Sequence, residues 1–150
     1  MATKRAAAYQ TIRVEPDRRL RGLVTITLDR PEKLNAIDAR MHDELQAACL
    51  ALKYDASARV VIVTGEGRAF SAGNDLRPKP QRPAKDDMER RLKLGAGGRT
   101  CDAIESLDQV TIAAVNGLAV GGAVVIASAC DLRLAAESAW FSIPEVDLAL

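Results

Sequence analysis

The chain has 150 residues, of which 48% are hydrophobic and 27% are charged, as in an ordinary soluble globular domain. Lysine plus arginine total 21 and aspartate plus glutamate total 20, so the net charge of +1 gives no case for nucleic acid or an anionic membrane as a partner. No run of about 18 apolar residues occurs, and the first ten residues lack the apolar core of a secretory signal. We therefore expect a cytoplasmic protein with no membrane span.

Cysteine and histidine are too few and too scattered for metal or triad chemistry. Cys49, Cys101 and Cys130 have no metal-ligand spacing, which favours reduced core or surface thiols and predicts no metal site. His42 is the single histidine and lies among residues with a helical pattern, so a structural role is favoured over a catalytic or ligand role. With one histidine, a Ser-His-Asp triad or a multi-histidine zinc site is hard to build.

The first half of the chain predicts three strands and one helix. We expect strands over 9–15, 22–30 and 60–65, a hairpin loop over 16–22, a loop over 31–37 and a helix to about residue 53. Asp38 is a plausible N-cap for that helix. The run VVIVTG at 60–65 is continuous and apolar, as in strands that are buried on both faces of a parallel sheet.

The second half predicts further strands that alternate with helices. We expect a loop over 77–87, a polar helix over 86–106 weakened by three glycines, a buried strand over 111–115, a helix over 123–130 and a strand over 131–136. Trp140 and Phe141 favour core packing over a stacking cradle for a ligand, and Asp131 favours a structural role. Strands that alternate with helices predict an α/β chain with a mainly parallel sheet.

Two stretches of small residues follow two of the predicted buried strands. They lie within TGEGRAFSAGNDL at 64–76 and VNGLAVGGAVV at 115–125. Ligands of α/β proteins bind beyond the carboxyl ends of strands, and Gly122 would open a helix whose first N–H groups are unpaired. Two such N–H groups, one from each loop, would make an oxyanion hole. Taken alone, each stretch is better explained by a turn or by close helix packing.

Three sequence blocks in this order resemble the enoyl-CoA hydratase/isomerase (crotonase) family. They are TLDRPEKLNAI (27–37), VVIVTGEGRAFSAGNDL (60–76) and IAAVNGLAVGGAVVIASACDLRLAAESAWFSIPEVDLAL (112–150), within a resemblance that covers roughly residues 8–150. The resemblance implies a crotonase-like spiral of ββα units with a mainly parallel sheet, usually assembled as a homotrimer or hexamer. It also implies that residues 1–150 form the N-terminal portion of the core, without the family's C-terminal helical region.

The same resemblance implies a lyase or isomerase of fatty acid metabolism that stabilises the enolate of an acyl-CoA thioester. The N–H groups of Asn74 and Gly122 fall on the oxyanion hole, and Glu145 falls on the acid/base of the family's PE pair. The residues that match the CoA-binding segments are Leu34, Ala36, Ala72, Asp75, Leu76 and Arg77. For Asp75 a capping or loop-bonding role is the favoured alternative. Coenzyme A enters as part of the substrate, so we expect no separate cofactor.

One position departs from the hydratase pattern. Hydratases of the family use two glutamates, and the first lies three residues after the second oxyanion glycine, where this chain has Val125. Valine cannot bond a water or carry a proton, whereas Glu145 alone can shuttle a proton between carbons flanking a double bond. An isomerase-type shuttle is therefore favoured over standard hydration. The alternatives are a non-catalytic CoA-binding or assembly subunit with the same fold, and a shortened product of doubtful activity.

Overall fold

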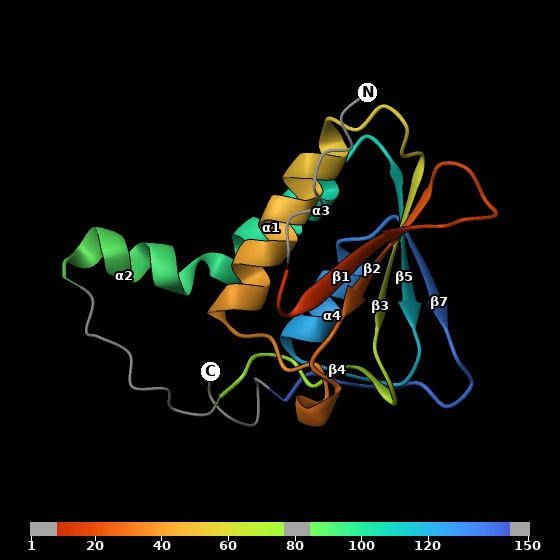
Figure 1. Cartoon of the computed structure of the whole chain (residues 1–150). Coiled ribbons are helices and arrows are strands. Elements are labelled where there is room, and N and C mark those ends of the chain that lie inside the picture. The colour runs from red at the N-terminus through yellow and green to blue at the C-terminus, as the bar shows by residue number, and fades with distance from the viewer. Residues whose placement is uncertain (1–8, 77–84, 145–150) are drawn as a thin grey trace.

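The computed structural model describes residues 9–76 and 85–144, which form two sheets and a group of helices (Figure 1). The strands are β1 (Ile12–Pro16), β2 (Leu23–Leu28), β3 (Val60–Gly65), β4 (Ala69–Ser71), β5 (Val110–Val115), β6 (Leu118–Val120), β7 (Leu132–Ala135) and β8 (Trp140–Ser142). The helices are the 3-10 turn η1 (Pro31–Lys33), α1 (Ala39–Lys53), α2 (Asp87–Leu94), α3 (Ala96–Glu105) and α4 (Gly122–Ser128). Within these ranges, no helix is both long and apolar enough to cross a membrane.

The chain alternates between the two sheets as it advances. The larger sheet has the order β1-β2-β3-β5-β7, and the smaller has the order β4-β6-β8. Strands β3, β5 and β7 each enter the larger sheet, and the strand that follows each of them enters the smaller sheet. All pairings are parallel except that of β1 with β2, which are joined by the predicted hairpin loop. The predicted spiral of ββα units with a mainly parallel sheet is confirmed.

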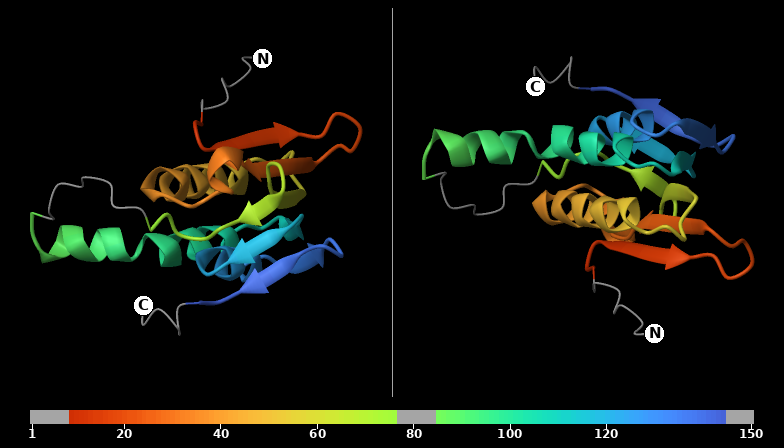
Figure 2. Two further views of the ribbon diagram at one scale, coloured as in Figure 1. Left: turned by 90° about the horizontal axis from the view of Figure 1, so that it is seen from below. Right: turned by 90° about the horizontal axis from the view of Figure 1, so that it is seen from above.

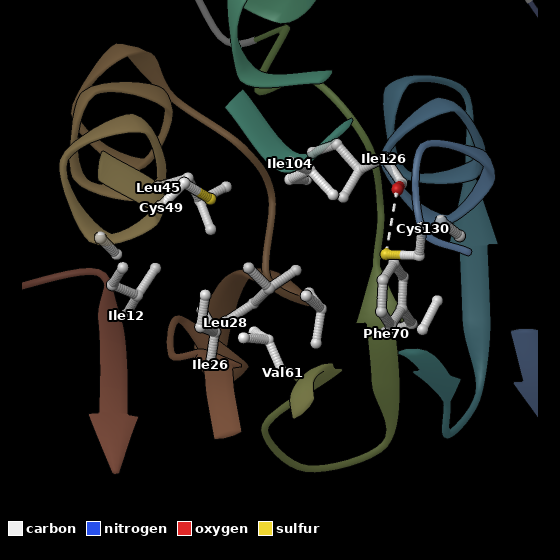
Figure 3. Close-up of a cluster of buried hydrophobic side chains, with 14 of the residues drawn as sticks. Ile12, Ile26, Leu28, Leu45, Cys49, Val61, Phe70, Ile104, Ile126 and Cys130 are labelled. Carbon is white, nitrogen blue, oxygen red and sulfur yellow. Dashed lines mark hydrogen bonds between the residues drawn. The ribbon is translucent and has the colours of Figure 1, made fainter. Parts of the chain in front are cut away.

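Helix α1 covers the larger sheet and supplies much of the core. Its N-terminus is fixed as predicted, because the Asp38 side chain accepts a hydrogen bond from the Met41 N–H at 3.0 Å. Leu45 and Cys49 face the side chains of the strands, among them Ile26 and Val61 (Figure 3). Burial raises the pKa of the Cys49 thiol to about 12, so this cysteine is a neutral core residue, as expected. Figure 2 shows α2 extending away from the sheets, while α1 and α3 lie side by side.

Some predictions about individual elements were wrong. The helix expected over 86–106 is two helices, α2 and α3, which meet at Gly95. Strands β4 and β6 were missed because each has only three residues and lies within a stretch of small residues. Strand β3 is not buried on both faces but alternates half-buried and buried side chains. Only one of its faces packs against the core.

The prediction of core packing for Trp140 and Phe141 was also wrong. These side chains are 58% and 49% exposed on β8. Strand β8 is the outer strand of the smaller sheet, next to β6, so one of its edges has no neighbouring strand among the described residues. Aromatic content alone did not reveal this edge position.

Replacing a buried leucine of α1 should destabilise the fold far more than replacing an exposed one. Leu45 is 0% exposed and Leu50 is 59% exposed on the same helix. We expect Leu45→Ala to lower the free energy of unfolding by about 2–5 kcal/mol, because it removes buried methyl groups and leaves a cavity. Leu50→Ala should change it by no more than about 0.5 kcal/mol. Urea unfolding followed by circular dichroism would measure both, and equal losses would contradict this account of the core.

Candidate active site

The two segments predicted to hold CoA lie side by side. The N–H of Ala72 donates to the Leu34 carbonyl at 2.8 Å, and the N–H of Ile37 donates to the Gly73 carbonyl at 2.8 Å. The N–H of Asp75 in turn donates to the Ile37 carbonyl at 2.8 Å. Residues 34–37 therefore run beside residues 72–75 as a short extension of strand pairing, with a parallel bridge between Ile37 and Asn74. The sequence predicted both segments but not their pairing.

Asn35 is the buried anchor of this pairing, and sequence reasoning gave it no role. Leu34 and Asn35 both have left-handed backbone conformations, with φ values of 51° and 54°. Asn35 is 0% exposed, and its Oδ1 accepts a hydrogen bond from the Arg30 N–H at 2.9 Å. Its Nδ2 donates to the carbonyls of Glu66 and Ala69, each at 2.9 Å. One side chain thus joins the 30–37 loop to both ends of the turn that connects β3 and β4.

The Asp75 carboxylate pairs with Arg30 of the neighbouring loop. The buried Arg30 guanidinium lies 3.4 Å from an oxygen of Asp75 and 3.4 Å from an oxygen of Asp38. Arg30 also donates to the Ala36 carbonyl. This ion-pair group holds together the two segments that were predicted to bind CoA, in line with the loop-bonding alternative for Asp75. Leu76 is 69% exposed at the end of the segment, and Arg77 lies outside the described residues.

The two small-residue stretches meet where parallel strands β4 and β6 end. Gly73 has a φ of 80°, and a Cβ atom placed on it would lie 2.3 Å from the Val120 carbonyl oxygen and 3.5 Å from the Gly122 nitrogen. Glycine is thus required for the loops to touch. Gly122 is the first residue of α4, so its N–H has no acceptor within the helix. The Asn74 N–H likewise has no acceptor within residues 9–76 and 85–144.

The Asn74 side chain lies across Gly122. The sequence interpretation gave a role only to the backbone N–H of Asn74. A Cβ placed on Gly122 would lie 3.0 Å from Asn74 Oδ1. His42 is 8% exposed on α1, and its Nδ1 lies 2.9 Å from the hydroxyl oxygen of Thr100 on α3. Burial lowers the pKa of His42. His42 is therefore a neutral, structurally engaged histidine next to the predicted oxyanion residues.

The remaining positions that the sequence interpretation singled out are Glu145 and Val125. Glu145 is outside the described residues, which end at Pro144, two residues after β8. Ser142 at the end of β8 accepts a hydrogen bond from the Gly121 N–H at 2.8 Å, so β8 ends beside the second glycine loop. Val125 is 53% exposed on α4 and presents an apolar surface.

Asp131 is structural, as expected, because its Oδ2 accepts the N–H and hydroxyl of Thr111 at 2.7 and 2.9 Å. These bonds hold the pKa of the Asp131 carboxyl below its usual value. Among the described residues, no group of three or more His, Cys, Asp and Glu side chains is placed to hold a metal ion.

Gly73 should tolerate no side chain, whereas Gly98 should. In Gly73→Ala the Cβ meets the Val120 carbonyl and the residue must keep a φ of 80°. We expect a loss of about 2 kcal/mol or more in the free energy of unfolding. A Cβ on Gly98, within α3, would meet nothing within 4 Å, so Gly98→Ala should stabilise the protein by up to about 1 kcal/mol. Thermal and urea unfolding would measure both, and a stable Gly73→Ala protein would show that the loops do not touch.

Comparison with known proteins identifies the family. The family model for enoyl-CoA hydratase/isomerase matches residues 18–150. A carnitinyl-CoA dehydratase of Salmonella enteritidis is 42% identical over 130 residues, which cover 85% of this chain and 48% of that protein. The mitochondrial Delta(3,5)-Delta(2,4)-dienoyl-CoA isomerase of Mus musculus is 33% identical over 150 residues, which cover 95% of this chain and 45% of that protein.

The structural comparison agrees with the sequence comparison. The crystal structure of an enoyl-CoA hydratase from Bacillus anthracis superposes with a TM-score of 0.81 at 37% identity, over 94% of this chain and 53% of that one. The chain spans about half the length of the curated relatives it matches. The family model, the sequence relatives and the solved structure agree, and the chain belongs to the enoyl-CoA hydratase/isomerase (crotonase) family.

Proposed function

We propose that this chain forms the thioester-binding part of an acyl-CoA enzyme that stabilises an enolate. The observation that supports this most directly is the close approach of Gly73 to Val120 and Gly122. It brings the N–H groups of Asn74 and Gly122 to adjacent strand ends, where a thioester oxygen could accept both hydrogen bonds. Preorganised N–H donors aimed at developing negative charge are the largest single source of stabilisation in many acyl-transfer and enolate reactions.

Coenzyme A would lie along the paired segments that lead to this hole. Leu34, Ala36 and Ala72 line the pairing of the two loops, while Leu76 and Arg77 follow it along the chain. We propose that Asp75 serves CoA binding indirectly, by holding Arg30 and the loop in place. Coenzyme A then enters and leaves as part of the substrate, and no separate cofactor takes part.

The proposed reaction is an isomerisation with one carboxylate. Glu145 removes a proton from the carbon next to the thioester carbonyl, and the electron pair moves onto the carbonyl oxygen. The N–H groups of Asn74 and Gly122 hold the resulting enolate oxygen. The enolate then collapses toward the neighbouring double bond, and protonated Glu145 returns the proton to the far carbon. The double bond has moved by one position, Glu145 is ionised again, and no co-reactant is needed.

Val125 is the reason for preferring isomerisation to hydration. It lies three residues after Gly122, where a hydratase of the family has its first glutamate, and its exposed side chain offers no proton donor or acceptor. The printed names of the relatives include both a dehydratase and an isomerase, so the family alone does not decide between lyase and isomerase chemistry. A cytoplasmic homotrimer or hexamer acting in fatty acid metabolism remains part of the proposal.

A non-catalytic CoA-binding or assembly subunit is the second candidate, and the same valine supports it. A chain that has lost one of two carboxylates could retain the fold and the CoA-binding segments without turnover. The two candidates differ in whether a proton leaves the carbon next to the thioester carbonyl.

Glu145→Gln should abolish proton exchange while leaving CoA binding largely intact, because glutamine cannot accept the proton. We would follow deuterium exchange at the acyl α-carbon, isomerisation of 3-enoyl-CoA to 2-enoyl-CoA, and water addition to crotonyl-CoA. Isomerisation that is lost in the variant would support the one-carboxylate reaction. Equal activity in the variant would remove Glu145 from the mechanism. CoA binding without exchange in either protein would favour the non-catalytic candidate.

Gly122→Pro and Gly122→Ala form a matched pair for the oxyanion hole. Both add carbon atoms beside Asn74 Oδ1, but only proline removes the N–H. Loss of one such donor typically lowers kcat by about 100- to 1000-fold, so we expect a loss of that size in Gly122→Pro and a much smaller one in Gly122→Ala. Equal losses in the two variants would mean that space near Asn74, and not the N–H, is what Gly122 provides.

A further inference from the structure

Arg30 is a buried arginine that contacts both of the paired segments at the candidate active site. It lies between β2 and η1 and is 6% exposed. One terminal nitrogen, Nη1, donates to the Ala36 carbonyl and lies 3.4 Å from Asp38 Oδ2. The other terminal nitrogen, Nη2, lies 3.4 Å from Asp75 Oδ2. The planar guanidinium therefore joins residues 36–38 to residue 75 through two separate nitrogens.

The backbone of Ile37 holds the chain on both sides of Asn74. The Ile37 N–H donates to the Gly73 carbonyl and the Ile37 carbonyl accepts the Asp75 N–H, each at 2.8 Å. A trans peptide group is planar, so the Gly73 carbonyl and the Asn74 N–H lie in one plane and point in opposite directions. The hydrogen bond that Ile37 gives to Gly73 therefore also sets the direction of the Asn74 N–H, which points away from Ile37.

Arg30 in turn holds Ile37 from both sides. Ala36 and Asp38 are the chain neighbours of Ile37, and Nη1 of Arg30 contacts both of them. Asp38 is itself fixed to the start of α1, because its Oδ1 accepts an N–H of that helix at 3.0 Å. The side chains of Arg30, Asp38 and Asp75 are no more than 12% exposed, so their charges are screened little by solvent.

We propose that Arg30 is a positioning residue for the oxyanion donor at Asn74. It fixes Ile37 through the two neighbours of that residue, and Ile37 fixes the peptide group that carries the Asn74 N–H. Arg30 also offsets the charge of Asp75, next to Asn74, where an unpaired carboxylate would repel an enolate oxygen. The effect on turnover rests on the proposed function, whereas the effect on the paired segments does not. Arg30 acts only through Ile37 and Asp75.

Arg30→Lys separates the shape of the guanidinium from its charge. Lysine keeps the positive charge, but its single nitrogen cannot take the places of Nη1 and Nη2 at once. We expect the amide protons of Ile37 and Asp75 to exchange with solvent about ten-fold faster or more, because the pairing opens locally, while the amides of β2 keep their rates. Hydrogen exchange followed by NMR measures this without substrate. Unchanged rates at Ile37 and Asp75, or a uniform increase that includes β2, would overturn the proposal.

Arg13→Lys is the matched control for this substitution. Arg13 also bridges two carboxylates, with its terminal nitrogens 2.6 Å from Asp29 Oδ2 and 2.5 Å from Glu66 Oε2, but its side chain is 40% exposed on β1. Arg13→Lys should leave exchange at Ile37 unchanged. If Arg30→Lys does not fold, Asp75→Asn takes its place, because it removes the charge that Nη2 meets and keeps the size of the side chain. Exchange at Ile37 should then rise by a smaller factor, and an unchanged rate would overturn the proposal.

Kinetics separate this inference from the proposed function. If Gly122→Pro shows its expected loss of turnover, Arg30→Lys should lower kcat by up to about 100-fold with little change in KM, because a displaced oxyanion donor affects the transition state most. Arg13→Lys should leave both constants unchanged. An unchanged kcat in Arg30→Lys, with or without a raised KM, would overturn the role of Arg30 at the oxyanion donor and leave the oxyanion hole standing. An inactive wild-type protein with the expected exchange pattern would reject the proposed function and leave the positioning of the Asn74 peptide group standing.

Discussion

The buried amide of Asn35 is the interaction on which the site depends. It forms hydrogen bonds with one N–H and two carbonyls at the point where β3 turns into β4. The backbone carbonyl of Asn35 then accepts the Ser71 hydroxyl at 2.7 Å, and that hydroxyl oxygen accepts the Gly73 N–H at 3.0 Å. Gly73 is thus positioned by a series of hydrogen bonds that starts at Asn35, whose backbone has a left-handed conformation. Leaving a buried polar group unpaired costs about 1–3 kcal/mol, so each step in the series resists displacement.

A second asparagine repeats this arrangement one turn of the spiral later. Asn116 follows β5, and its Nδ2 donates to the carbonyls of Gly65 and Gly67 at 3.0 and 2.9 Å. Its Oδ1 accepts the Gly65 N–H at 3.2 Å. The neighbouring Gly117 is pressed against the backbone, since a Cβ there would lie 2.2 Å from the Arg68 carbonyl oxygen. Amide side chains and bare glycines therefore set the spacing of successive turns, and this spacing brings the ends of β4 and β6 together.

These contacts explain how far the sequence could be interpreted. Long periodic segments such as α1 and β2 were predicted because their own residues determine them, through capping by Asp38 and alternation along the strand. The glycine stretches predicted a close approach of two loops, which requires small residues, and the structure brings the two stretches together. The roles of Asn35 and Thr100 could not be predicted, because they depend on partners 31 to 58 residues away. The exposure of Trp140 likewise depends on which strand lies at the edge of a sheet, a property of the topology and not of the local sequence.

In the proposed site, the backbone and the side chains would determine different parts of the reaction. The N–H groups of Asn74 and Gly122 belong to loops that Gly73 and the buried Asn35 bring into contact. The side chains next to them, Asn74 and Val125, are both exposed and are not part of the core. In the proposed site, the backbone would stabilise the enolate in both hydration and isomerisation, whereas the fate of the proton would depend on side chains such as Val125 and Glu145. A valine at position 125 is compatible with the packing of α4, because the α4 residues that pack into the core are Ala123, Ile126 and Ala127.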